Sequence, residues 1–140
     1  METLGHIRAC KPEECHSLVR ILRETNLLSS ADTEEAFRKK LYHDRESIQI
    51  FYCGGEVVGM VIFVYDPWAS FIWHLAIRPV CQGHGFGRRL IKKAEEIVAR
   101  RGGRLTCAYI LEGNKNSRRT FQKSGYREYP MPIIPVEKNL

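Results

Sequence analysis

The sequence predicts an α/β (α+β) fold, with a mixed, mostly antiparallel sheet of about seven strands and four helices. Strand-like segments follow one another through the middle of the chain and are separated by Gly-Gly and Asp-Pro turns. A strongly amphipathic helix then separates two strands, as in a parallel crossover. A single domain, residues 1–140, is expected because this length holds one core and no second domain of ordinary size.

Two helices are expected to follow a short first strand at residues 7–10. From residue 13 to about residue 25, apolar side chains recur on one helical face. The second helix begins after Asp32 or Thr33, because both residue types are favoured helix N-caps. These two helices therefore precede most of the sheet.

Three strands are expected next, without an intervening helix. Segments 47–53 and 56–65 are joined by Gly54-Gly55, which is typical of a two-residue hairpin turn. The third strand covers residues 70–77. This arrangement favours three antiparallel neighbours.

The clearest helix begins near Arg88. Its apolar positions follow the i, i+1, i+4, i+7, i+8 pattern, and charged residues occupy the opposite side. Gly102-Gly103 ends it. The remaining expected elements are a strand at 105–111, a short helix from Asn114 to Ser124, and strand candidates at 126–129 and 133–136.

The composition is that of an ordinary folded protein, with 44% hydrophobic and 27% charged residues. No run of about eighteen uncharged apolar residues occurs, so no membrane span is expected. The first six residues lack a signal-peptide pattern, which favours a cytoplasmic protein. The five cysteines are odd in number and scattered, so neither a disulfide framework nor a metal site is expected.

The formal net charge of +6 and the pI near 9.2 permit an anionic partner without identifying one. A nucleic acid, an anionic cofactor and a simply soluble surface all fit this charge. No helix-turn-helix, zinc-finger or RNA-recognition signature accompanies it, so no nucleic-acid partner is expected.

The most informative segment lies between the third central strand and the amphipathic helix. Gly83, Gly85 and Gly87 alternate there, which permits a sharp turn and close approach of backbone to a ligand. The free N–H groups of a helix N-terminus suit phosphate. Arg88 and Arg89 in the first turn oppose the helix dipole unless an anion is bound, which hints at one.

Two familiar phosphate-binding loops do not fit this segment. The run GxxxxGK[ST] is absent from the chain. The dinucleotide fingerprint GxGxxG fails because, counted from Gly83, its sixth position is Arg88. Taken alone, the glycine loop leaves a simple tight turn as an equal alternative.

A family resemblance joins this loop to a second segment. Gln82-x-x-Gly85-x-Gly87 resembles the acyl-CoA loop Q/R-x-x-G-x-G/A of the GNAT (Gcn5-related N-acetyltransferase) superfamily. Residues 114–126 are similar to the family's second motif, N-x-x-A-x-x-x-Y-x-K-x-G-F, which occurs at the expected distance. The order of elements matches along nearly the whole chain, and the chain resembles a small bacterial single-domain member.

The resemblance implies the GNAT acyl-CoA N-acyltransferase fold, with acetyl-CoA as co-substrate. Loop N–H groups would hold the pyrophosphate, and pantetheine would bond the strand edge that opens between residues 75–77 and 105–111. Asn114 would contact the pantetheine arm. The implied cofactor-binding residues are Leu75, Ala76, Ile77, Gln82, Gly83, His84, Gly85, Phe86, Gly87, Arg88, Asn114, Ser117 and Phe121.

The implied reaction is direct attack by a primary amine on the acetyl thioester in a ternary complex, which would make the chain a transferase. A base should take a proton from the amine, and an acid should assist the departing thiolate. Proximity alone supplies a large part of such rates. Arg118 and Arg119 are expected to help recruit the anionic cofactor.

The proton-transfer residues depart from the family pattern. Phe121 occupies the position of the usual tyrosine acid and cannot donate a proton. Tyr109 stands where ribosomal-protein N-terminal acetyltransferases carry a glutamate base. Tyr109 and His74 are the catalytic candidates, each with a purely structural role as the alternative. His74 alternates with Trp73 along a strand, so only one of the two is expected to face the cleft.

The acceptor is left open by the sequence. A small amine or an amino acid is favoured over a protein N-terminus or lysine, and the basic surface disfavours polyamines. Tyr65, Phe71 and Trp73 either shape the acceptor pocket or fill the core. A non-catalytic acyl-CoA sensor is the alternative function, because the usual acid is absent. Both a monomer and a homodimer are compatible with the chain.

Overall fold

The structure, a computed structural model, describes residues 5–140; part of the segment used to argue against a signal peptide lies outside this range. The described residues form a five-stranded sheet in the order β1-β2-β3-β4-β5. β1 (Gly5–Ala9), β2 (Ile48–Cys53), β3 (Glu56–Val64) and β4 (Ser70–Ile77) are antiparallel neighbours, whereas β5 (Thr106–Ala108) is parallel to β4. The mixed, mostly antiparallel sheet is therefore confirmed.

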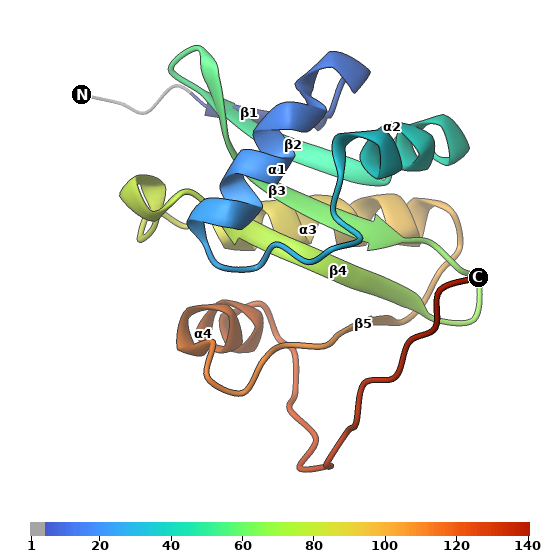
Figure 1. The fold of residues 1–140 in the computed structure, drawn as a ribbon. Helices are drawn as coiled ribbons and strands as arrows, with labels where there is room; N and C mark the ends of the chain where they lie inside the picture. The colour runs from blue at the N-terminus through green and yellow to red at the C-terminus, as the bar shows by residue number, and fades with distance from the viewer. Residues whose placement is uncertain (1–4) are drawn as a thin grey trace.

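Helices cover both faces of the sheet (Figure 1). α1 (Cys15–Glu24) and α2 (Glu34–His43) lie on one face, and α3 (Phe86–Arg100) lies on the other. α3 provides the expected crossover between the parallel strands β4 and β5. α4 (Lys115–Lys123) follows β5, and short 3₁₀ helices η1 (Pro12–Glu14) and η2 (Pro79–Cys81) precede α1 and the glycine loop.

Each face of the sheet has its own apolar core. The α1/α2 side is filled by fully buried side chains that include Leu18, Ile21, Leu22, Ile50 and Met60. On the α3 side, the rings of Phe51 and Phe86 stack with centroids 4.0 Å apart. Phe86 thereby anchors the first turn of α3 to the sheet, directly after the glycine loop.

The hairpin between β2 and β3 has the predicted two-residue turn. Gly54 and Gly55 have φ angles of 60° and 83°, and a turn with two positive φ angles strongly favours glycine. The turn therefore fixes the antiparallel register of the central strands.

The prediction of about seven strands is wrong at the C-terminal side. Segments 126–129 and 133–136 form no strand; Pro130, Pro132 and Pro135 lack the N–H that a sheet ladder needs, and Ile134 is 84% exposed. The expected strand at 105–111 is reduced to three residues, because the chain diverges from β4 after Ala108. This divergence opens the candidate site.

No helix within residues 5–140 is both long enough and apolar enough to cross a membrane.

Candidate active site

The site begins where β4 and β5 separate. The two strands pair only over residues 70–72 and 106–108. Residues 73–77 of β4 have a partner strand on the β3 side and none on the β5 side among the described residues. Half of the hydrogen-bonding groups in this stretch therefore face an open edge.

The orientation of this edge follows from the end of the strand. Arg78 donates its backbone N–H to the carbonyl of Val58 on β3, at 2.9 Å. Because backbone groups alternate along a strand, those of Leu75 and Ile77 point away from β3. Consistent with this, the carbonyl of Ile77 accepts a hydrogen bond from the Gln82 side chain, at 3.0 Å. The backbone of Leu75 remains free to bind a ligand.

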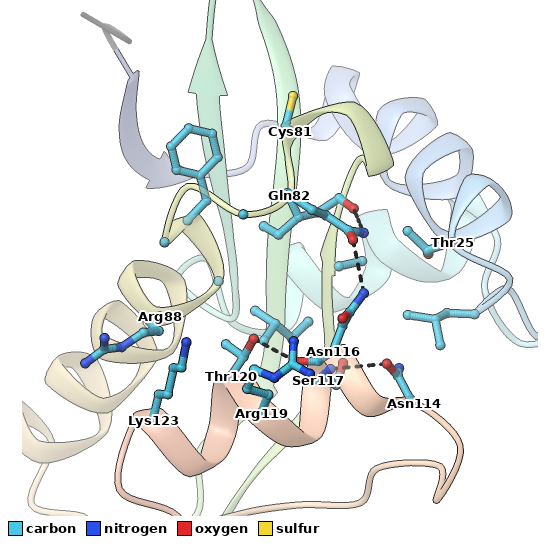
Figure 2. A pocket seen from close by; sticks show the side chains of 18 residues that line it. Thr25, Cys81, Gln82, Arg88, Asn114, Asn116, Ser117, Arg119, Thr120 and Lys123 are labelled. Atoms are coloured by element: carbon cyan, nitrogen blue, oxygen red, sulfur yellow. Dashed lines mark hydrogen bonds between the residues drawn. The ribbon is translucent and has the colours of Figure 1, made fainter.

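A cleft of about 450 Å³ opens between the end of β4, the glycine loop and α4 (Figure 2). Of the thirteen residues expected to bind the cofactor, all but His84 and Phe121 line it. Those brought together are Leu75, Ala76, Ile77, Gln82, Gly83, Gly85, Phe86, Gly87, Arg88, Asn114 and Ser117. The two sequence motifs, about thirty residues apart, therefore meet in one cavity.

The glycine loop presents backbone donors to this cleft. Gly83 and Gly85 have φ angles of 85° and 80°, in the left-handed region that favours glycine. Among the described residues, none accepts a hydrogen bond from the successive backbone N–H groups of residues 83–88. Unpaired N–H groups around such a turn and a helix N-terminus are suited to bind phosphate oxygens.

One side-chain hydrogen bond joins the loop to α4, and another caps α4 (Figure 2). The side-chain oxygen Oε1 of Gln82 accepts a hydrogen bond from the Asn116 side-chain amide, at 3.3 Å. Asn114 caps α4, because its side-chain oxygen accepts a hydrogen bond from the Ser117 N–H at 3.2 Å. Gly87 lets the two helices approach closely, since a Cβ there would lie 3.1 Å from Thr120 Cγ2.

Among the expected cofactor residues, His84 differs in that its side chain does not line the cleft. Its Nδ1 is 3.1 Å from the Cys81 carbonyl oxygen, and its ring stacks on Phe86 with centroids 5.6 Å apart. The side chain therefore packs on its own loop and does not line the cleft, although its backbone N–H remains unpaired.

Three cations line the same cleft. Figure 2 shows Arg88 extending from α3 and Arg119 and Lys123 extending from α4. None of the three forms an ion pair with a carboxylate within residues 5–140. Lys123 is not among the residues predicted from the sequence to bind the cofactor. Because it lies four residues after Arg119, about one helical turn, the two side chains are expected on the same face of α4.

Two neighbouring arginines have other partners. Arg118 forms an ion pair with Glu128 at 2.8 Å, which raises the pKa of Arg118 and lowers that of Glu128. The guanidinium of Arg89 lies over the Phe51 ring, 4.8 Å from its centroid. Arg118 therefore already has a carboxylate partner and does not line the cleft, and Arg88 is the cleft-lining member of the pair Arg88-Arg89.

A smaller hollow of about 180 Å³ continues from the cleft toward the middle of β4. Both cavities are lined by Leu27, Leu75, Asn114 and Ser117, so they are neighbouring parts of one groove. The hollow collects the two catalytic candidates, His74 and Tyr109. Phe121 lines this hollow and does not line the larger cleft. Its side chain is only 4% exposed, and its ring contacts Tyr126 edge-on.

Trp73 and His74 both line the hollow. The β3–β4 register shifts at this point: Ile62 pairs with His74 and Phe63 pairs with Ile72, so Trp73 has no opposite residue. This irregularity breaks the alternation of side chains along β4.

The three aromatic residues whose role was left open have different surroundings. Tyr65 donates its hydroxyl hydrogen bond to the Arg101 carbonyl at 2.8 Å and is therefore structural. Phe71 contacts the ring of Tyr109, with centroids 5.0 Å apart. Trp73 borders the hollow and is 60% exposed.

His74 is held by a carboxylate from a distant loop. Its Nε2 is 3.1 Å from Asp32 Oδ1, and the two side chains are 20% and 9% exposed. The other Asp32 oxygen accepts hydrogen bonds from the backbone N–H and the hydroxyl of Ser29, at 2.8 and 2.9 Å. Asp32 and Thr33 are the two N-cap candidates for α2, and Thr33 takes that role because its side chain accepts a hydrogen bond from the Ala36 N–H.

Thiol and metal chemistry find little support in this region. Burial raises the pKa of the Cys81 thiol, which lines the cleft, so this thiol stays protonated. Within residues 5–140, no group of three His, Cys, Asp or Glu side chains is placed to hold a metal ion. One end of the groove is lined by the glycine loop and three cations, and the other end is lined by His74 and Tyr109.

Comparison with known proteins is consistent with this geometry. The model of the family "Acetyltransferase (GNAT) family" matches residues 15–126. Acetyltransferase plu1384 of Photorhabdus laumondii is 24% identical over 96% of this chain and 94% of its own length. Acetyltransferase ECA0875 of Pectobacterium atrosepticum is 27% identical over 77% of each chain.

Solved structures show the same fold. The PaiA N-acetyltransferase of Thermoplasma acidophilum, determined in complex with coenzyme A, superposes with a TM-score of 0.82 at 14% sequence identity. The similarity covers 94% of each chain. At this level of identity, the likeness concerns the fold.

Proposed function

The chain belongs to the GNAT family of acetyltransferases, and from this premise we propose that it transfers the acetyl group of acetyl-CoA to the primary amine of a small acceptor. The proposal rests on one observation: unpaired backbone N–H groups and unpaired cations lie in the same cleft. Both features recognise phosphate, and the cleft reaches the open edge of β4.

The cleft residues fit coenzyme A. The N–H groups of residues 83–88 are suited to its pyrophosphate, and Arg88, Arg119 and Lys123 add positive charge for its phosphates. The free backbone of Leu75 and the side-chain amide of Asn114 can bond the peptide-like groups of pantetheine. In this orientation the acyl end extends toward the hollow.

Bound acetyl-CoA supplies an activated acetyl thioester. The amine nitrogen attacks the thioester carbonyl carbon, so that a C–N bond forms as the C–S bond breaks. One proton of the substrate ammonium leaves before attack, and a second proton is lost to the departing thiolate. Tyr109 and His74 are the side chains proposed for these transfers, and holding the two substrates together contributes much of the rate.

A non-catalytic acyl-CoA sensor is the second candidate. It is favoured by Phe121, whose ring fills the position of the usual acid and has no proton to donate. Tight binding of acetyl-CoA without transfer to any amine would support this function over the enzyme.

Calorimetric titration with acetyl-CoA tests the proposed cofactor site. We expect micromolar binding to the wild type and none to Gly85→Glu, whose carboxylate would repel phosphate. Gly55→Glu is the matched control, because Gly55 also has a positive φ (83°) with open space around it, in a remote hairpin. Absence of wild-type binding, or equal loss in both variants, would contradict the proposal.

A further inference from the structure

The hollow beside the cleft differs chemically from the end proposed to bind phosphate. Its titratable lining side chains are His74 and Tyr109, and no carboxylate or cation among residues 5–140 lines it. We propose that this hollow is the acceptor site, that it takes an amine carried on an apolar body without a second charge, and that Asp32 positions His74 to remove the amine proton. This inference rests on the proposed function and deepens it.

The walls of the hollow fit an apolar body. Trp73 and Tyr109 are 60% and 63% exposed, so their rings offer apolar surface that an acceptor would cover. Covering such surface contributes about 25 cal/mol per Å², and aromatic partners gain from ring contacts. The volume of about 180 Å³ is below the range of about 300–1,000 Å³ common for larger ligands, which favours a small acceptor.

The charges around the groove argue against other amine classes. A polyamine or an aminoglycoside carries several cations, which would need carboxylates that the hollow does not have. An amino acid carries a carboxylate, and the cations that line the groove, Arg88, Arg119 and Lys123, all belong to the phosphate end. Placing an unpaired charge in an apolar pocket is costly. A monoamine with a neutral body avoids both penalties.

The geometry of His74 suits a base. Because Asp32 accepts a hydrogen bond at Nε2, that nitrogen carries the proton of the neutral imidazole, and Nδ1 has the free electron pair. No described residue is hydrogen-bonded to Nδ1. Asp32 does not line the hollow, and Ser29 fixes its second oxygen. Asp32 therefore acts through His74 as a positioning residue.

The protons balance as follows. Nδ1 takes one proton from the substrate ammonium and becomes part of an imidazolium stabilised by the Asp32 carboxylate. The neutral amine forms the C–N bond, the C–S bond breaks, and the second amine proton ends on the coenzyme A sulfur. Release of the proton from His74 to water restores the base, so one proton is released in each turnover.

A panel of amines tests the acceptor class. The probes are 2-phenylethylamine, spermidine and phenylalanine; we measure binding to the coenzyme A-loaded protein by calorimetry and kcat/KM by thiol release. We expect 2-phenylethylamine to exceed both other compounds by at least about tenfold. Preference for spermidine or phenylalanine would overturn the inference. So would failure of 2-phenylethylamine to bind when acetyl-CoA binds normally, whereas absence of acetyl-CoA binding would remove the proposed function as well.

Two variants test the His74–Asp32 pair. His74→Gln and Asp32→Asn should each lower kcat for 2-phenylethylamine by about 100-fold, the lower end for general-base catalysis. The KM of the amine and the Kd of acetyl-CoA should stay within about threefold. His43→Gln and Glu35→Gln, which change exposed residues of α2, are the matched controls and should keep wild-type kcat.

A readout specific to proton removal separates catalysis from structure. Aniline is already neutral at neutral pH and needs no base to expose its electron pair. The loss of kcat in His74→Gln and Asp32→Asn should therefore be at least about tenfold smaller for aniline than for 2-phenylethylamine. Equal losses for both amines, or an unchanged kcat in either variant, would contradict the assigned roles. Melting temperatures identify a variant that has simply lost its fold.

Discussion

The two ends of the groove are proposed to recognise their ligands by different means. At the phosphate end, the backbone N–H groups of residues 83–88 and three cations provide the binding groups, and side-chain shape matters little. At the hollow, the groups proposed to bind the acceptor are the side chains of Trp73, His74 and Tyr109, and Asp32 is bonded to His74. A backbone site needs glycines in a fixed pattern, whereas a side-chain site can change with single substitutions.

Variants at the two ends of the groove should therefore affect different quantities, cofactor binding at one end and turnover at the other. Changes at the phosphate end should alter the Kd of acetyl-CoA and its salt dependence, because charged contacts are screened by salt. Changes at the hollow should alter kcat or acceptor preference and leave that Kd in place. Variants with both effects would show that the two ends do not act separately.

Reversing the charge on α4 should have the largest effect. In Arg119→Glu/Lys123→Glu, we expect the Kd of acetyl-CoA to rise by at least about 100-fold, since each reversal replaces attraction with repulsion worth about 1.5 kcal/mol. Lys92→Glu/Arg104→Glu changes the net charge equally at exposed positions outside the cleft. Calorimetry on both pairs checks the prediction, and similar losses in the two would mean that overall charge, not the cleft, attracts the ligand.

Removing the Tyr109 hydroxyl should have an intermediate effect on turnover. We expect Tyr109→Phe to lower kcat by about 10- to 100-fold, because the hydroxyl is proposed to protonate the departing thiolate. The ring contact with Phe71 is retained in this variant, so the Kd of acetyl-CoA should not change. Steady-state kinetics with calorimetry checks both values; a wild-type kcat would exclude Tyr109 as the acid.

Two adjacent arginines offer a smaller, matched comparison. Arg88→Ala should weaken acetyl-CoA binding by about fivefold, or roughly 1 kcal/mol, because this side chain lines the cleft. Arg89→Ala should leave the Kd within about twofold, because Arg89 lies over Phe51 instead. Titrations at two salt concentrations should show a reduced salt dependence for Arg88→Ala alone. The reverse order of effects would place the phosphates elsewhere.

The smallest functional effect is expected from an ion-pair cluster outside the groove. Arg101 bonds Asp44 at 2.8 and 2.9 Å and Glu46 at 2.9 Å, and these bonds lower the pKa of both carboxyls. Arg101→Met should lower the free energy of unfolding at pH 7 by about 1–2 kcal/mol after solvent screening. The Kd of acetyl-CoA should not change.

The pH dependence of this effect has a defined sign. Carboxyls whose pKa is lower in the folded state stabilise the protein above their unfolded pKa of about 4, and this stability is lost as pH falls through the folded pKa. The stability difference between wild type and Arg101→Met should therefore shrink between about pH 5 and pH 3. Urea unfolding at several pH values measures it; a difference independent of pH would contradict the assignment.

The sequence could predict the phosphate end because its requirements are local. Glycines that tolerate a positive φ, placed between a strand and a helix, predict a sharp turn there, and the family resemblance adds the phosphate role. Asn114 is of a residue type favoured at a helix N-cap. The same locality explains the confirmed Gly54-Gly55 turn. Local pattern was not enough for residues 126–136. They have strand-like apolar residues, but they form no strand, and Pro130, Pro132 and Pro135 lack the N–H that a sheet ladder needs.

The hollow could not be predicted to the same depth, because it depends on tertiary contacts. Asp32 and His74 are 42 residues apart, and only the packing of α1 and α2 on the sheet brings them together. A register irregularity lies at Trp73, and the two consecutive residues Trp73 and His74 both line one cavity. Neither feature has a sequence signal that is independent of the fold.

An amide NMR titration tests most directly whether the groove is divided in this way. We expect coenzyme A to shift the backbone N–H signals of Gly83, Gly85 and Gly87, and 2-phenylethylamine, added to the loaded protein, to shift the Trp73 indole N–H. The indole of Trp68, which does not line either cavity, should stay unchanged as an internal control. Coenzyme A shifts centred away from residues 83–88, or equal responses of the two indoles to the amine, would contradict the division.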